Sequence, residues 1–138
     1  FRGLLADGEQ DIIRLSTNNG MIGYKINKFQ AIGAEPGEHN AEHTLKLYKR
    51  QQGSVDNAIN FTDSNLLGMC YIQDNIDDAY PFSSAIIFDN ETFNQDIFIT
   101  HSDTAGSRAC NYYVELEQVK LDLSEATVAT LKDMRGRE

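Results

Sequence analysis

The residues whose spacing most resembles a reaction centre are His39, Glu42 and His43. They match an H-x-x-E-H pattern, in which two histidines four positions apart on a helix bind one zinc ion and the glutamate activates a bound water. Residues 44–48, however, alternate between apolar and polar types as a strand does. Along a strand, positions four apart are roughly 13 Å from each other, too far to share a metal. We therefore interpret this pattern as a solvated loop leading into a strand, and we predict no metal and no cofactor.

Acidic and amide side chains gather in two further stretches, 74–78 and 89–96, with Asp103 close by. Their oxygen atoms are of the kind that calcium prefers, but neither stretch has the spacing of a calcium loop. Asp and Asn are ordinary turn residues because they bond to nearby backbone groups, so we predict turns here. His101 lies beside Ser102 and Asp103 without a nucleophile elbow or a second base, and we interpret it as a partly buried strand histidine. We expect no catalytic residue and a protein that is not an enzyme.

Length, composition and charge limit the kinds of protein that this chain can be. The chain has 138 residues, 41% of them apolar, which suits a single domain over 1–138 with one core. Its 12 basic and 21 acidic residues give a net charge of −9, which opposes direct binding to nucleic acid. No apolar run is long enough to span a membrane. Cys70 and Cys110 both fall in strand patterns, which favours free buried thiols; a disulfide across facing strands stays open as the alternative.

Apolar alternation predicts at least seven strands, near 11–15, 22–31, 44–50, 58–62, 66–73, 85–88, 97–101 and 110–123. The Asn18-Asn19-Gly20 turn predicts that the first two pair as a hairpin, and a phase change predicts a bulge near Lys28. A second phase change predicts a bulge near Glu117 or Gln118. Many short strands at regular spacing favour an all-β fold, an antiparallel, jelly-roll-like β-sandwich.

Two local patterns add detail. The strand over 44–50 carries His43, Leu45 and Leu47 on one face and polar residues on the other, which predicts a half-exposed strand. After Ser124, a good N-cap, apolar residues recur every three positions at Val128, Leu131 and Met134. We therefore predict a short C-terminal helix over 124–134, packed on the core by that stripe.

Six tyrosines offer a second kind of surface. An aromatic face can stack on a sugar ring while its hydroxyl stays hydrogen-bonded, so a glycan-binding β-sandwich module is the alternative function. The absence of tryptophan and the core phase of most of the tyrosines weaken this alternative. The tyrosines are Tyr24, Tyr48, Tyr71, Tyr80, Tyr112 and Tyr113.

Three blocks, Phe88–Ile97, His101–Thr104 and Ala109–Glu117, resemble small virion structural proteins of marine tailed bacteriophages. The likeness extends from about Asp11 to Asp133, which is most of the chain. The resemblance implies a non-enzymatic structural subunit of the virion, assembled in the host bacterial cytoplasm, and we expect a capsid decoration or cement protein. It transfers no functional residue to this chain.

The resemblance also implies partners, namely other virion proteins such as the major capsid protein or tail proteins, together with further copies of this chain. An unpaired sheet edge or a terminal arm is a natural contact in such assemblies. We expect residues 1–8 to form an N-terminal arm, with Phe1, Arg2, Leu4 and Leu5 touching the partner. On that view, deletion of residues 1–5 should weaken assembly and leave the fold intact.

Overall fold

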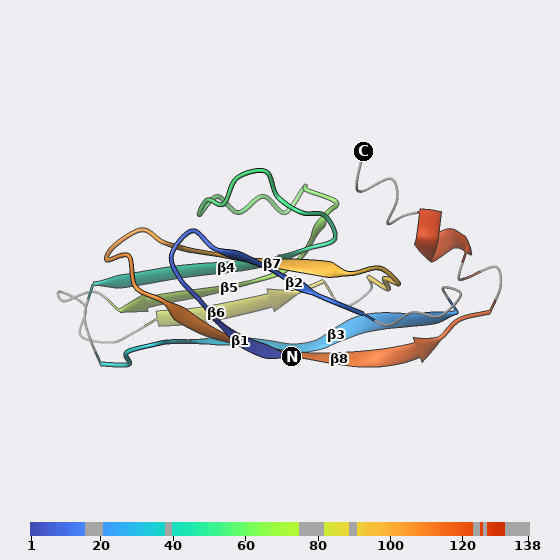
Figure 1. The fold of residues 1–138 in the computed structure, drawn as a ribbon, viewed down its shortest axis with the longest axis horizontal. Helices are drawn as coiled ribbons and strands as arrows, with labels where there is room; N and C mark the ends of the chain where they lie inside the picture. The colour runs from blue at the N-terminus through green and yellow to red at the C-terminus, as the bar shows by residue number, and fades with distance from the viewer. Residues whose placement is uncertain are drawn as a thin grey trace.

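The computed structural model describes residues 1–15, 21–37, 40–74, 82–88, 91–122, 125 and 127–131. Within these ranges the chain forms eight strands, and Figure 1 shows them in two layers. The strands are β1 (Arg2–Leu5), β2 (Gln10–Ile13), β3 (Ile22–Gly33), β4 (Ala41–Tyr48), β5 (Leu66–Asp74), β6 (Phe82–Ile87), β7 (Ile97–Asp103) and β8 (Cys110–Lys120).

The two layers are antiparallel sheets, one of order β1-β8-β3 and one of order β2-β7-β4-β5-β6. The first strand pairs with the last, the second with the seventh, and the fourth with the fifth. The chain is thus doubled back on itself and rolled up, which is the jelly-roll arrangement. The prediction of an all-β, jelly-roll-like antiparallel sandwich is confirmed.

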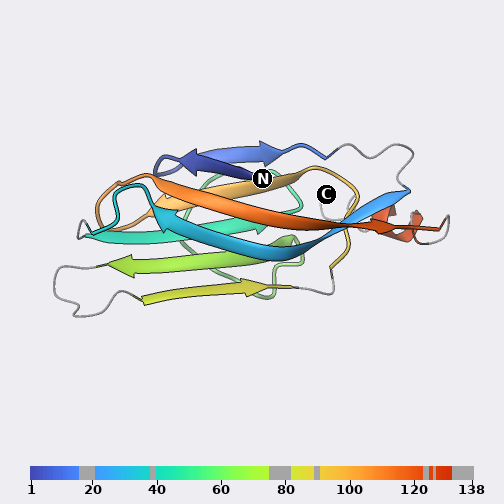
Figure 2. The same ribbon diagram turned by 90° about the horizontal axis from the view of Figure 1, so that it is seen from below.

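Strand β6 departs from the jelly-roll pairing. In a regular jelly roll the third strand pairs with the sixth, but here β6 pairs with β5 at the edge of the larger sheet. Within the described ranges, the outer edge of β3 pairs only at Tyr24, in a bridge to Phe93. Seen from below, β5 and β6 lie beside the smaller sheet and are not covered by it (Figure 2). The sandwich is therefore open along β3.

The core lies between the sheets and follows the period-two alternation of the strands. Phe29 and Val114 of the smaller sheet and Leu45, Leu47 and Ile99 of the larger one are at most 1% exposed. Cys70 and Cys110 are both buried and both free, as predicted.

The predicted hairpin is wrong. β2 pairs with β7 in one sheet, and β3 pairs with β8 in the other, so the chain crosses between layers instead of turning back. The predicted Asn18-Asn19-Gly20 turn lies outside the described residues. Turn propensity is a local signal, whereas the partner of a strand is chosen by the burial of its whole apolar face.

Of the two predicted bulges, one is confirmed. The β3–β8 register shifts between Ile26 and Lys28. No shift occurs near Glu117 or Gln118, which pair with Lys25 and Tyr24 in continuous register, so that prediction is wrong. The apolar residues of the chain move from even to odd positions there because the end of β8 extends beyond the main core. Val119 and Leu121 belong to a second, small apolar cluster with Met21 and Ala129.

β4 is buried on both faces, so the prediction of a half-exposed strand is wrong. Thr44, Lys46 and Tyr48 are at most 7% exposed, and the loop after β4 folds back over Lys46 and Tyr48. The Lys46 ammonium donates to Asp56 at 2.9 Å and to the Ala58 carbonyl. The strand predicted over 58–62 is part of this loop, held by side chain–backbone turns instead of by a partner strand.

Helical structure is described at residues 125 and 127–131, in agreement with the predicted C-terminal helix. Its buried residue is Ala129, whereas Val128 and Leu131 are 54% and 49% exposed, so the predicted packing stripe is wrong for these two. Met134 lies outside the described residues. Two contacts determine which face of the helix packs on the sandwich. Ala129 packs against Leu121, and the Asn94 amide donates to Thr130 Oγ1 at 2.7 Å. No helix in the described part of the chain has the length and hydropathy to cross a membrane.

Candidate functional site: an open groove and the adjoining sheet face

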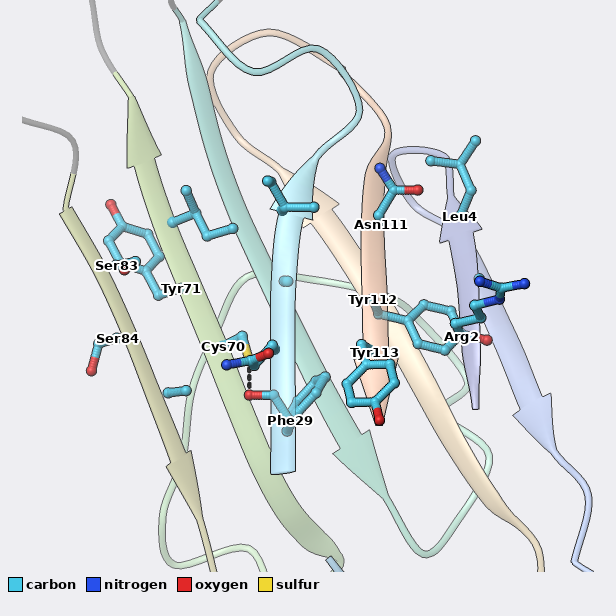
Figure 3. Close-up of a pocket in the computed structure, with 16 residues that line it drawn as sticks. Arg2, Leu4, Phe29, Cys70, Tyr71, Ser83, Ser84, Asn111, Tyr112 and Tyr113 are labelled. Carbon is cyan, nitrogen blue, oxygen red and sulfur yellow. Dashed lines mark hydrogen bonds between the residues drawn. The ribbon is translucent and has the colours of Figure 1, made fainter. Parts of the chain in front are cut away.

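The open edge of β3 borders a groove of about 860 Å³. Strands β5 and β6 form one side of it, and β3, β8 and β1 form the other (Figure 3). Its floor is apolar, with Phe29 and Cys70, and the Cys70 thiol donates to the Phe29 carbonyl at 3.3 Å. A volume of this size lies in the range of small-molecule sites.

Polar groups converge on the rim of the groove. Ser83 and Ser84 stand on β6, and Arg2 and Asn111 stand across from them on β1 and β8 (Figure 3). Three tyrosines also line it: Tyr71, Tyr112 and Tyr113. Tyr112 is 7% exposed, with burial raising the pKa of its hydroxyl, whereas Tyr113 is 43% exposed. The groove can therefore offer the accessible ring of Tyr113, with amide and guanidinium groups on the same side and hydroxyl groups on the opposite side.

The outer face of the smaller sheet continues from the groove. Leu4, Asn111 and Ile32 are cross-strand partners and so point to the same side, as do Arg2, Tyr113 and Gln30 in the next row. Leu4 and Ile32 are 55% and 58% exposed. We call these two rows, Arg2, Leu4, Gln30, Ile32, Asn111 and Tyr113, the assembly face. Large exposed apolar side chains grouped on one face are typical of a protein contact.

The predicted partner residues divide between this face and the core. Arg2 and Leu4 lie on the assembly face, and Phe1 beside it is 54% exposed. Leu5 is fully buried, and the Phe1 amino group and carbonyl both bond to Val114 backbone groups. In this chain the segment is thus a sheet strand followed by a tight turn and not a detached arm, and deletion of residues 1–5 would remove core.

A second cluster lies inside the sandwich. The Nδ1 atom of His43 on β4 lies 2.9 Å from Nε2 of His101 on β7. His101 Nδ1 is 3.0 Å from the Ala6 carbonyl, which can only accept, so this nitrogen carries a proton. In the neutral ring Nε2 then accepts, and His43 Nδ1–H donates. Both rings are at most 2% exposed, and burial, followed by the repulsion that two protonated rings would exert on each other at this distance, lowers the pKa of His43.

Asp103, at the end of β7, is the cross-strand partner of His43 and lies at the same end of the sandwich. Burial alone would raise the pKa of this carboxyl, but hydrogen bonds from four backbone N–H groups lower it overall. Three of these donors, Ala105, Gly106 and Arg108, belong to the turn after β7, and the fourth is Glu42. The carboxylate is therefore a fixed turn anchor, in agreement with the predicted turn chemistry.

The other sequence candidates do not assemble into a reaction centre within the described residues. His39 lies outside those residues, as do Asn75, Asp77, Asp78, Asp89 and Asn90. Glu42 accepts from Thr104 Oγ1 at 3.0 Å, and Asp96 accepts from the Leu15 backbone N–H at 2.7 Å. His101 was predicted to be partly buried and is 0% exposed.

Sequence reasoning missed both the groove and the pairing of His43 with His101. A signal for the second existed: His43 shares its phase with Leu45 and Leu47, and His101 shares its phase with Ile97 and Ile99, so both histidines fall on core faces. No sequence pattern indicated the groove, because the groove forms where β6 pairs with β5 instead of with β3. Comparison of the chain with family models, with curated proteins and with solved structures found no match.

Proposed function

We propose that this protein is a non-enzymatic structural subunit of a phage virion, most specifically a capsid decoration or cement protein, and that the assembly face carries its contact with the particle. The observation that carries the proposal is the pair of exposed apolar side chains, Leu4 and Ile32, on the outer face of the smaller sheet. They lie next to the edge of β3, which within the described ranges pairs only at Tyr24. Jelly rolls are a common architecture of virion proteins, and the sequence blocks resemble such proteins. The net charge of −9 would keep the free subunit soluble before it assembles.

Leu4→Lys should lower the occupancy of the purified protein on particles at least tenfold, because an ammonium in an apolar contact must be desolvated. The side chain is 55% exposed, so the fold should tolerate the change. The measurement is rebinding of the labelled chain to particles, followed by sedimentation. Ile59→Lys, at an exposed loop position remote in sequence, is the matched control and should rebind like the wild type. Equal occupancy of both variants would count against the assembly face.

The groove favours a second candidate function, a glycan-binding module. Its accessible Tyr113 ring, with Asn111 and Arg2 on the same side of the groove and Ser83 and Ser84 across it, combines a stacking surface with groups that bond to sugar hydroxyls. On a glycan array, Tyr113→Ala should abolish binding while Tyr113→Phe, which keeps the ring, should retain most of it. An array without any bound glycan would remove this candidate and leave the assembly proposal untouched.

A further inference from the structure

His43, His101 and Cys110 bring three metal-binding side chains together between the sheets, on the inner side of β8, whereas the assembly face is on its outer side. One ligand atom from each lies within 4.8 Å of the others. The three residues are 2%, 0% and 0% exposed, respectively. Two imidazoles and a thiol are costly occupants of an apolar interior unless their polar atoms find partners. In the structure the two rings bond to each other, and the Cys110 thiol donates to the Ile32 carbonyl at 3.4 Å. A shared metal ion would replace these contacts and bind all three side chains at once.

We propose that these three residues bind one soft metal ion with a filled d shell, Zn²⁺ or Cu⁺, through a ring nitrogen of each histidine and the thiolate of Cys110. Thiolate and imidazole donors suit these two ions and not the oxygen-seeking Mg²⁺ or Ca²⁺. The three donors come from three strands, β4, β7 and β8, and so from both sheets. Binding would therefore join the two layers of the sandwich at this end.

The geometry needs small adjustments. Metal–nitrogen bonds of about 2.0 Å and metal–sulfur bonds of about 2.3 Å at near-tetrahedral angles place the nitrogens about 3.3 Å apart and sulfur about 3.5 Å from each. The facing histidine nitrogens are now 2.9 Å apart, so the rings must separate slightly and the thiol must approach. Gly33 leaves the space for this movement, because a Cβ there would come within 3.2 Å of His43 Nε2.

Protons balance in a simple way. The Cys110 S–H bond breaks, one proton leaves to solvent, and the sulfur electron pair forms the metal–sulfur bond. The proton that His43 Nδ1 now donates to His101 moves to Nε2 of the same ring, so that both imidazoles stay neutral and each gives a lone pair to the metal. Without a metal, burial and then the charge of Asp103 raise the pKa of Cys110 to about 12. The same Asp103 carboxylate would favour a cation bound near it.

Metal binding to the full-length chain, first dialysed against a chelator, tests the proposal. Zn²⁺ is titrated by calorimetry, and Cu⁺ is titrated anaerobically against a coloured chelator. The expected result is one equivalent of one of these ions bound, a higher Tm, and affinity at least 100-fold weaker in Cys110→Ser. Cys70→Ser is the matched control, since Cys70 is also buried, also bonds to a backbone carbonyl and also has its pKa raised to about 12. Failure of both ions to bind, or equal affinity in the two variants, would overturn the proposal.

Cobalt gives a readout that needs no variant. Co²⁺ bound in the place of Zn²⁺ to the wild-type chain should show a thiolate-to-metal charge-transfer band. If Cys110→Ser fails to fold, this spectrum still decides, because bound cobalt without a thiolate band would contradict the assignment of Cys110 as a ligand.

Discussion

Leu5→Ala should lower the free energy of unfolding by about 2–5 kcal/mol, the usual cost of truncating a leucine inside a packed core. Leu5 is 0% exposed and faces the interior beside Cys110, its cross-strand partner on β8. Alanine would leave a cavity between the sheets that the rigid ladders on either side cannot close. Urea denaturation followed by circular dichroism measures the difference.

The adjacent residue supplies the control. Leu4 has the same side chain on the same strand but points outward and is 55% exposed, so Leu4→Ala should change stability by no more than about 0.5 kcal/mol. The pair separates the two roles of the N-terminal strand, since position 5 contributes to the fold and position 4 to the proposed contact. Equal effects at both positions would mean that β1 does not pack on β8 as described.

Asp103→Ala should destabilise the protein by about 3 kcal/mol or more, because it leaves four backbone donors without their charged acceptor. The loss should be concentrated at one end of the sandwich. Native-state hydrogen exchange should accordingly show faster exchange at the amides of Ala105, Gly106 and Arg108, whose bonds to Asp103 are 3.0, 3.3 and 2.7 Å long.

Two comparisons sharpen this expectation. Asp103→Asn should also destabilise, since an amide nitrogen would replace one accepting oxygen and face a backbone N–H. Asp63→Ala is the matched turn control: that carboxylate accepts the Asn65 N–H at 2.9 Å, so the cost should be nearer 1 kcal/mol. A stable Asp103→Ala variant with unchanged exchange would show that the turn is held by other contacts.

The strands were predictable from the sequence because each is a local pattern. Side chains on a strand alternate between faces, so runs such as Leu45 and Leu47, or Ile97 and Ile99, mark a buried face without any knowledge of the neighbouring strand. The bulge near Lys28 was predictable for the same reason, since an extra residue shifts the phase. The shift near Gln118 looked identical but came from a second apolar cluster around Leu121.

What could not be predicted depends on partners far apart in the chain. The His43–His101 pair joins residues 58 positions apart, and the sequence offered His39 as the more obvious companion of His43. The groove exists because β6 pairs with β5 and not with β3, a choice that depends on the packing of whole sheets. The burial of Lys46 likewise depends on a loop whose polar sequence indicates only that it is a loop.

The central claim is that this chain is a structural part of a virion, and copy number on the particle tests it most directly. Lysate from the infected host is separated on a density gradient, and quantitative mass spectrometry follows this chain relative to the major shell protein. The proposal predicts a fixed ratio across the particle peak, high for a decoration subunit and low for a tail component. A chain confined to the soluble fractions at the top of the gradient would contradict it.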